Sequence, residues 1–258
     1  MKIKKIYDLV ERRYLIGKIK LQPLFESMYR FSLRGMNYGQ NHSVETSGEL
    51  WVLKFASKVF NKNSIIFDVG ANKGQFLKNI INSFSHYNQI HCFEPSLSAF
   101  NILAKKAEGL ENVQINNLGL SNKSGKLNLY YDSEASVMAT LNSRSEKKHS
   151  EEVTISTIDT YCLSMNISHI NYLKLDVEGF EYNVLLGAAN MLAKRQIDFI
   201  QFEFGKNNMD QGIFLSDFIT LLSGYRIYRI VKNGIREIKE YNLYHEVFLT
   251  TNYLAIKV

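Results

Sequence analysis

An acidic residue and a glycine-containing turn, Asp68-Val69-Gly70-Ala71-Asn72-Lys73-Gly74, directly follow a short apolar segment. Parallel sheets bind ligands at the carboxyl ends of their strands, and glycine lets the backbone approach a ligand closely. The dinucleotide pattern G-x-G-x-x-G would need glycine where Asn72 stands. A carboxylate would repel a pyrophosphate, whereas it would attract the sulfonium and ammonium groups of S-adenosylmethionine. The spacing therefore favours S-adenosylmethionine over NAD.

A second acid, Glu94, ends the next predicted strand, 26 residues after Asp68. A carboxylate there can accept hydrogen bonds from both hydroxyls of an adenosine ribose. This role occurs with either cofactor, so Glu94 supports a bound nucleoside without choosing between them. The third strand is expected to end near Asn117, where residues could face the adenine ring.

A third group of acids follows a later apolar strand, in Lys174-Leu175-Asp176-Val177-Glu178-Gly179-Phe180-Glu181, and Glu203 lies in the strand after that. Such carboxylates can hold a hydroxyl nucleophile and remove its proton, or bind Mg²⁺ or Ca²⁺, which leaves metal dependence open. The alternative for Glu178 and Glu181 is that they stabilise the first turn of the next helix. We expect Asp176, Glu178 and Glu203 to be the catalytic candidates.

Alternating strands and helices are expected to position these residues. The pattern predicts an α/β fold with a mostly parallel sheet, helices on both faces and an antiparallel C-terminal pair of strands. The sequence predicts strands at 64–69, 89–93, 112–120, 126–131, 153–158, 170–175, 197–204, 225–231 and 247–256, and helices at 49–60, 75–84, 96–108, 182–194 and 213–222. Residues 132–150 are expected to form a long loop.

Charge is concentrated at the N-terminus. Residues 1–36 hold nine basic and three acidic residues, which equals the net charge of +6 for the whole chain. We therefore expect a basic helical extension at 1–48 and a catalytic domain at 49–258, with no net charge over residues 37–258. Tyr14 and Ile19 belong to an apolar stripe on this arm, which either packs on the body or lies on an anionic membrane or a charged partner.

Composition excludes several classes of protein. The two cysteines, Cys92 and Cys162, are too few and too far apart for a disulfide framework or a CxxC zinc site. No apolar run is long enough to span a membrane, so we expect a cytoplasmic protein, with peripheral contact at the inner membrane face as a hypothesis. The neutral body argues against nucleic acid as a partner. Oligomeric state stays open.

Three segments resemble the FkbM family of S-adenosylmethionine-dependent methyltransferases: IIFDVGANKGQF (65–76), HCFEPSLSAF (91–100) and TIDTYC…INYLKLDVEGFEYNVLLGA (157–188). The resemblance implies a class I methyltransferase fold and O-methylation. The implied acceptor is a carbohydrate hydroxyl, in a bacterial surface glycan or its precursor, or a hydroxyl of a secondary metabolite. It places Asp176 and Glu178 on the substrate side. The cofactor contacts we expect are Asp68, Gly70, Ala71, Asn72, Gly74, Gln75, Glu94, Pro95, Asn117 and Asp176.

Three other functions have less support in the sequence. Amino-methylating DNA enzymes commonly need a D/N-P-P-Y-type motif, which a chain with only Pro23 and Pro95 does not have. An NAD-dependent sugar enzyme would need three closely spaced glycines at the first turn. A binding scaffold without activity is not favoured, because all the acids are present.

Overall fold

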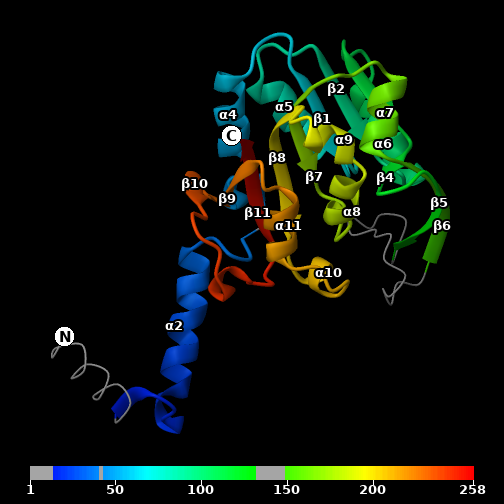
Figure 1. Cartoon of the computed structure of the whole chain (residues 1–258). Helices are drawn as coiled ribbons and strands as arrows, with labels where there is room; N and C mark the ends of the chain where they lie inside the picture. The colour runs from blue at the N-terminus through cyan, green and yellow to red at the C-terminus, as the bar shows by residue number, and fades with distance from the viewer. Residues whose placement is uncertain (1–13, 41–42, 132–148) are drawn as a thin grey trace.

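The computed structural model describes residues 14–40, 43–131 and 149–258, and its central element is an eight-stranded sheet (Figure 1). The strand order is β10-β9-β11-β8-β7-β1-β2-β3. β1, β2, β3, β7 and β8 pair in parallel, whereas β11 is antiparallel to both β8 and β9. The strands are β1 (Ile65–Val69), β2 (Gln89–Phe93), β3 (Val113–Asn116), β7 (Ile170–Leu175), β8 (Ile197–Phe204), β9 (Tyr225–Val231), β10 (Gly234–Glu237) and β11 (Thr251–Lys257). The predicted class I architecture is confirmed.

Helices cover both faces of this sheet, because the side chains of its buried strands point alternately to opposite sides. Ile66 and Tyr172 pack with helices on one face, while Phe67 and Leu173 pack with helices on the other. The first face carries α4 (Glu49–Val59), α5 (Gln75–Ser83) and α6 (Leu97–Ala107). The second carries α7 (Ile158–Ser164), α8 (Glu181–Leu186), α9 (Ala189–Ala193) and α11 (Leu215–Leu221).

A smaller three-stranded sheet, β4-β6-β5, lies beside the main one. It consists of β4 (Gly119–Leu120), β5 (Gly125–Tyr131) and β6 (His149–Ser156). The prediction of one strand over 112–120 is therefore wrong, because the chain leaves the main sheet after Asn116 and β4 pairs with β6. Of the expected loop at 132–150, residues 149 and 150 belong to β6, and 132–148 lie outside the described residues.

The helix expected over 182–194 is broken in two at Gly187. A Cβ there would stand 2.0 Å from the backbone oxygen of Ser121, so the two backbones approach too closely for a side chain. Asp159 then caps the second piece, because its carboxylate accepts hydrogen bonds from the backbone N–H groups of Asn190 and Met191 at 2.8 and 3.1 Å. A helical interruption of this kind depends on a distant strand and leaves little local signal.

The N-terminal part of the described chain projects from the body (Figure 1). It contains a short 3-10 helix, η2 (Ile19–Leu21), followed by α2 (Gln22–Gly35) with Pro23 in its first turn. Tyr14 and Ile19 are exposed, so these two members of the apolar stripe do not pack on the body. The stripe's other members, in residues 1–13, lie outside the described residues. The remaining elements are α3 (Val44–Ser47), α10 (Lys206–Met209) and a second 3-10 helix, η3 (Leu243–His245).

Candidate active site

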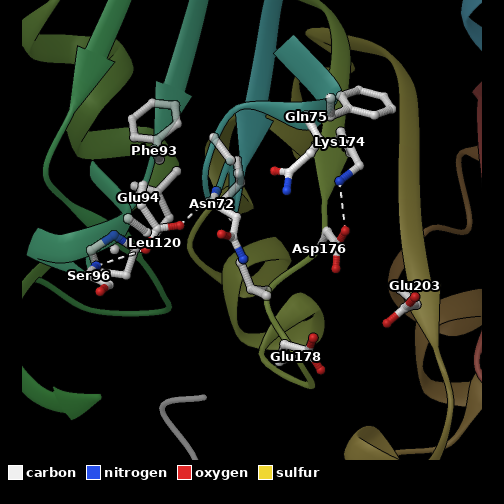
Figure 2. A pocket seen from close by; sticks show the side chains of 18 of the residues that line it. Asn72, Gln75, Phe93, Glu94, Ser96, Leu120, Lys174, Asp176, Glu178 and Glu203 are labelled. Carbon is white, nitrogen blue, oxygen red and sulfur yellow. Dashed lines mark hydrogen bonds and ion pairs between the residues drawn. The ribbon is translucent and has the colours of Figure 1, made fainter. Parts of the chain in front are cut away.

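A cavity of about 330 Å³ lies at the carboxyl ends of β1, β2, β7 and β8, within the size range of small-molecule sites. Figure 2 shows Glu94 and Ser96 on one side of this pocket, Asp176, Glu178 and Glu203 toward the other, and Asn72 between them. Five carboxylates line the cavity together with a single lysine, Lys174, within the described part of the chain: Glu49, Glu94, Asp176, Glu178 and Glu203. A pocket of this composition favours a positively charged ligand.

The turn after β1 is shaped by close backbone contacts. Gly70 has φ +81°, and a Cβ there would stand 1.8 Å from the backbone oxygen of Asp176. The backbone N–H groups of Gly70 and Ala71 both donate to the oxygen of Phe93 at 3.0 Å, which ties this turn to the end of β2. Glycine is therefore required at position 70, and the bare backbone forms part of the pocket wall.

Glu94 joins two loops of the pocket through its carboxylate. One oxygen accepts a hydrogen bond from the backbone N–H of Asn72 and the other from that of Ser96, each at 2.8 Å. Burial raises the pKa of Glu94 to about 7, although these two donors pull it down. Ser96 directly precedes α6, and its side chain makes no capping bond to the helix; instead, its backbone N–H donates to Glu94.

Asp68 lies one layer beneath the cavity wall. Its side chain is fully buried, and neither carboxylate oxygen has a hydrogen-bond partner among the described residues. The register of the sheet sets Asp68 beside Lys174 and Lys174 beside Gln201, in one row across β1, β7 and β8. Lys174 Nζ is 4.0 Å from Asp68 Oδ1 and 2.8 Å from Asp176 Oδ2. Asp68 therefore acts on the pocket through Lys174.

Glu49, the first residue of α4, completes this buried cluster. Its two oxygens accept hydrogen bonds from Gln201 Nε2 at 2.8 Å and Ser47 Oγ at 3.0 Å. Burial raises the pKa of Glu49, and the charge of Lys174 opposes that rise. Neither Glu49 nor Lys174 is among the site residues predicted from the sequence. Lys174 could have been found from the strand register, which places it opposite Asp68, whereas Glu49 carries no local signal.

Buried polar groups stabilise the turn that contains Asp176 and Glu178. Glu181 accepts hydrogen bonds from the backbone N–H groups of Val177 and Gly179 at 3.0 and 3.2 Å, and from Asn208 Nδ2 at 2.7 Å. Glu181 thus stabilises the turn that precedes α8. Asn207 Nδ2 donates to Glu178 Oε2 at 2.8 Å, and Glu178 adopts φ +54°, a costly conformation for a residue with a side chain.

The structure brings most of the predicted site residues together. Gly70, Ala71, Asn72, Gln75, Glu94, Pro95, Asp176, Glu178 and Glu203 line the cavity. Asp68, Gly74 and Asn117 do not. A Cβ on Gly74 would meet Leu103 of α6 at 2.8 Å, so this glycine serves helix packing. The Asn117 side chain donates to the backbone oxygens of Glu94 and Pro95, so it fixes the loop from outside the cavity.

The residues present fit S-adenosylmethionine. Glu94, at the end of β2, could accept hydrogen bonds from ribose hydroxyls, the bare backbone at Gly70 leaves room for a ligand, and the surplus of carboxylates over Lys174 suits a sulfonium and an ammonium group. In the part of the chain that the structure describes, no group of three or more His, Cys, Asp or Glu residues is arranged to hold a metal ion. No helix among the described residues is long and apolar enough to cross a membrane.

Comparisons with known structures found methyltransferases. The FkbM methyltransferase from Methylobacillus flagellatus KT matches with a TM-score of 0.51 and 13% identity, over 80% of this chain and 47% of that one. The plantazolicin methyltransferase BamL, solved with SAH, matches with 0.48 and 10%, over 90% of each chain. A putative methyltransferase of Streptococcus mutans in complex with SAH matches with 0.38 and 12%, over 80% of this chain and 96% of that one.

The chain spans about half the length of the Methylobacillus protein. A comparison with curated proteins gave no match. The family model described as the methyltransferase FkbM domain matches residues 68–229, more than half of the chain, from Asp68 of the first turn to Arg229 of β9. That range includes the glycine turn after β1, Glu94, the turn with Asp176 and Glu178, and Glu203. The chain therefore belongs to the FkbM family of S-adenosylmethionine-dependent methyltransferases.

Proposed function

We propose that the protein is an O-methyltransferase that methylates a hydroxyl of a sugar, in a bacterial surface glycan or its precursor, in the cytoplasm. The observation that carries this proposal is the position of Asp176, Glu178 and Glu203, which line the pocket from two strand ends opposite Glu94. Three carboxylates in one place can accept several hydrogen bonds from a polyhydroxylated acceptor. The electrostatic neutrality of residues 37–258 gives no support to a nucleic-acid acceptor.

In this proposal, one side of the cavity binds the cofactor and the other side binds the acceptor. Glu94, Asn72 and the backbone at Gly70 would hold the nucleoside part of the cofactor, which supplies an electrophilic methyl group when bound. Asp176 and Glu203 would orient the acceptor hydroxyl and take its proton, because an alcohol must lose that proton to become an ether. Fixing the hydroxyl in line with the methyl group contributes on the order of 7–11 kcal/mol at best, so positioning is the larger part of the catalysis.

Methyl transfer to nucleotide sugars and glycan fragments tests this proposal, with S-adenosylmethionine labelled in its methyl group. Glu203→Gln should lower turnover by about 10²-fold or more while leaving the affinity for the cofactor within about twofold, since a general base contributes about 10²–10⁴-fold. Glu111→Gln, at an exposed acid outside the cavity, is the matched control. Full turnover by Glu203→Gln would remove Glu203 from the mechanism, and transfer only to non-sugar alcohols would point to a secondary metabolite.

A further inference from the structure

Helix α2 presents an apolar face that nothing in the described chain covers. Its side chains Leu24, Met28 and Phe31 are 55%, 53% and 73% exposed. Leu33 is the one α2 residue buried against the described body. An isolated helix of this length is marginal in water, so α2 needs a partner that covers the apolar face. The face is defined by Leu24, Phe25, Met28, Tyr29, Phe31 and Met36, all exposed.

The charges of α2 indicate what kind of partner it is. Arg30 and Arg34 lie on the opposite side of the helix from the apolar face, by its 100° periodicity, and Lys18 and Lys20 precede the helix. Glu26, which forms a long, exposed ion pair with Arg30 at 4.0 Å, is the one acid in residues 14–36. Residues 14–36 therefore carry a net charge of +3, which an anionic surface would neutralise and a second copy of this chain would not.

The joint between α2 and the body is tied down by hydrogen bonds at the edge of the sheet where the cavity lies. Tyr38 is buried, and its hydroxyl accepts a hydrogen bond from Arg229 Nη1 at 2.6 Å. The backbone N–H of Gly39 donates to the oxygen of Thr250 at 3.2 Å, just before β11 begins. Thr251 pairs with Phe204, the last residue of β8, so the joint stands at the carboxyl edge of the sheet, where the cavity lies.

We propose that α2 is an interfacial helix that docks the enzyme on an anionic lipid bilayer. A helix with aromatic and aliphatic side chains on one face and basic side chains on the other lies in the plane of such an interface. Because α2 leaves the body at the carboxyl edge (Figure 1), docking brings the pocket close to the lipid headgroups. The docking depends on α2 alone and is independent of which acceptor the enzyme methylates.

Sedimentation of the full chain with vesicles tests this inference. The protein should bind vesicles of phosphatidylcholine mixed with phosphatidylglycerol, and bind phosphatidylcholine alone at least about tenfold more weakly. Raising the salt from about 0.1 M to about 1 M should release it, because the Debye length falls from about 10 Å to about 3 Å. Equal binding to both kinds of vesicle, or no binding, would overturn the proposal.

Variants separate the helix from the rest of the surface. Leu24→Ser/Met28→Ser/Phe31→Ser and Arg30→Glu/Arg34→Glu should each lower binding at least about tenfold. Leu163→Ser is the matched control, because Leu163 is equally apolar and 82% exposed but lies on α7. Thermal unfolding of the body should be unchanged in all three. If the triple variant sediments like Leu163→Ser, or instead converts a wild-type dimer to a monomer, then α2 serves another partner and the proposal fails.

Discussion

The substitution Asp68→Asn removes a charge that the fold holds at a cost. The Asp68 carboxylate is fully buried, without a hydrogen-bond partner among the described residues, and the nearest ammonium, Lys174 Nζ, is 4.0 Å away. Burial raises the pKa of Asp68 to about 6; Lys174 lowers this value, while Asp176 and Glu49 raise it further. At neutral pH and above, the folded protein therefore carries an ionised group in an unfavourable place.

The magnitude follows from the two pKa values of Asp68. In the unfolded chain the group has its ordinary pKa of 3.8, so between that value and about 6 the folded state holds more protons. Its contribution to stability is fully present below 3.8 and is lost as the pH rises through 6, which amounts to about 3 kcal/mol. An amide does not titrate, so the stability of Asp68→Asn relative to wild type should rise by about 3 kcal/mol between about pH 4 and about pH 8.

Urea unfolding over a series of pH values measures this difference. The free energy that burying the amide of Asp68→Asn costs is the same at every pH, so it does not affect how the difference in stability between variant and wild type changes with pH. Asp198→Asn is the control with the opposite sign. Burial raises the pKa of Asp198, but hydrogen bonds from His169 and Lys257 outweigh that effect and lower it, so its contribution is lost as the pH falls. A relative stability of Asp68→Asn that stays flat with pH, or follows Asp198→Asn, would refute the reasoning.

Three further predictions concern the turns of the site. Gly70→Ala should destabilise the protein by more than about 3 kcal/mol in urea unfolding, because the Cβ would stand 1.8 Å from a backbone oxygen. Gly109→Ala, with φ +76° and open space around it, should cost only about 1–2 kcal/mol. Affinity for S-adenosylmethionine, measured by calorimetry, should rise as the pH passes 7, where Glu94 ionises, and this rise should be absent in Glu94→Gln. Asn208→Ala should cost about 1–3 kcal/mol in thermal unfolding, because it removes a donor from the buried Glu181.

The sequence predicts best the strands that are buried on both faces. The predicted bounds at 89–93, 170–175 and 197–204 agree with β2, β7 and β8, because strands that are mostly buried on both faces are rich in apolar residues. The bounds at 225–231 also agree with β9, which is a partly exposed strand. It fails where a break depends on a distant neighbour. Gly187 interrupts a helical pattern because of Ser121, and the chain leaves the main sheet after Asn116 to pair with β6. Neither partner is visible in the local sequence.

The residues of the candidate site likewise fall into those that the sequence predicts and those that it does not. Glu94, Asp176 and Glu203 follow or end apolar strands, so the rule that ligands bind at the carboxyl ends of parallel strands is enough to find them. Gly74 and Asn117 satisfy the same rule but have other roles. Gly74 allows α6 to pack closely, and the Asn117 side chain donates a hydrogen bond to the backbone of Glu94. A position near the carboxyl end of a strand therefore predicts that a residue lies close to the pocket, but not that it lines the pocket.

The charge of the pocket arises from strand register, which no single segment of the sequence displays. Asp68, Lys174 and Gln201 are separated by more than a hundred residues from first to last, yet parallel pairing aligns them in one row. Gln201 donates a hydrogen bond to Glu49 at the start of α4. The carboxylates of Asp68, Asp176 and Glu49 therefore share one ammonium group, that of Lys174. When all three are ionised, Lys174 neutralises only one of them. A bound cation would relieve the rest of this repulsion, so binding of S-adenosylmethionine should stabilise the folded protein more at about pH 8 than at about pH 5.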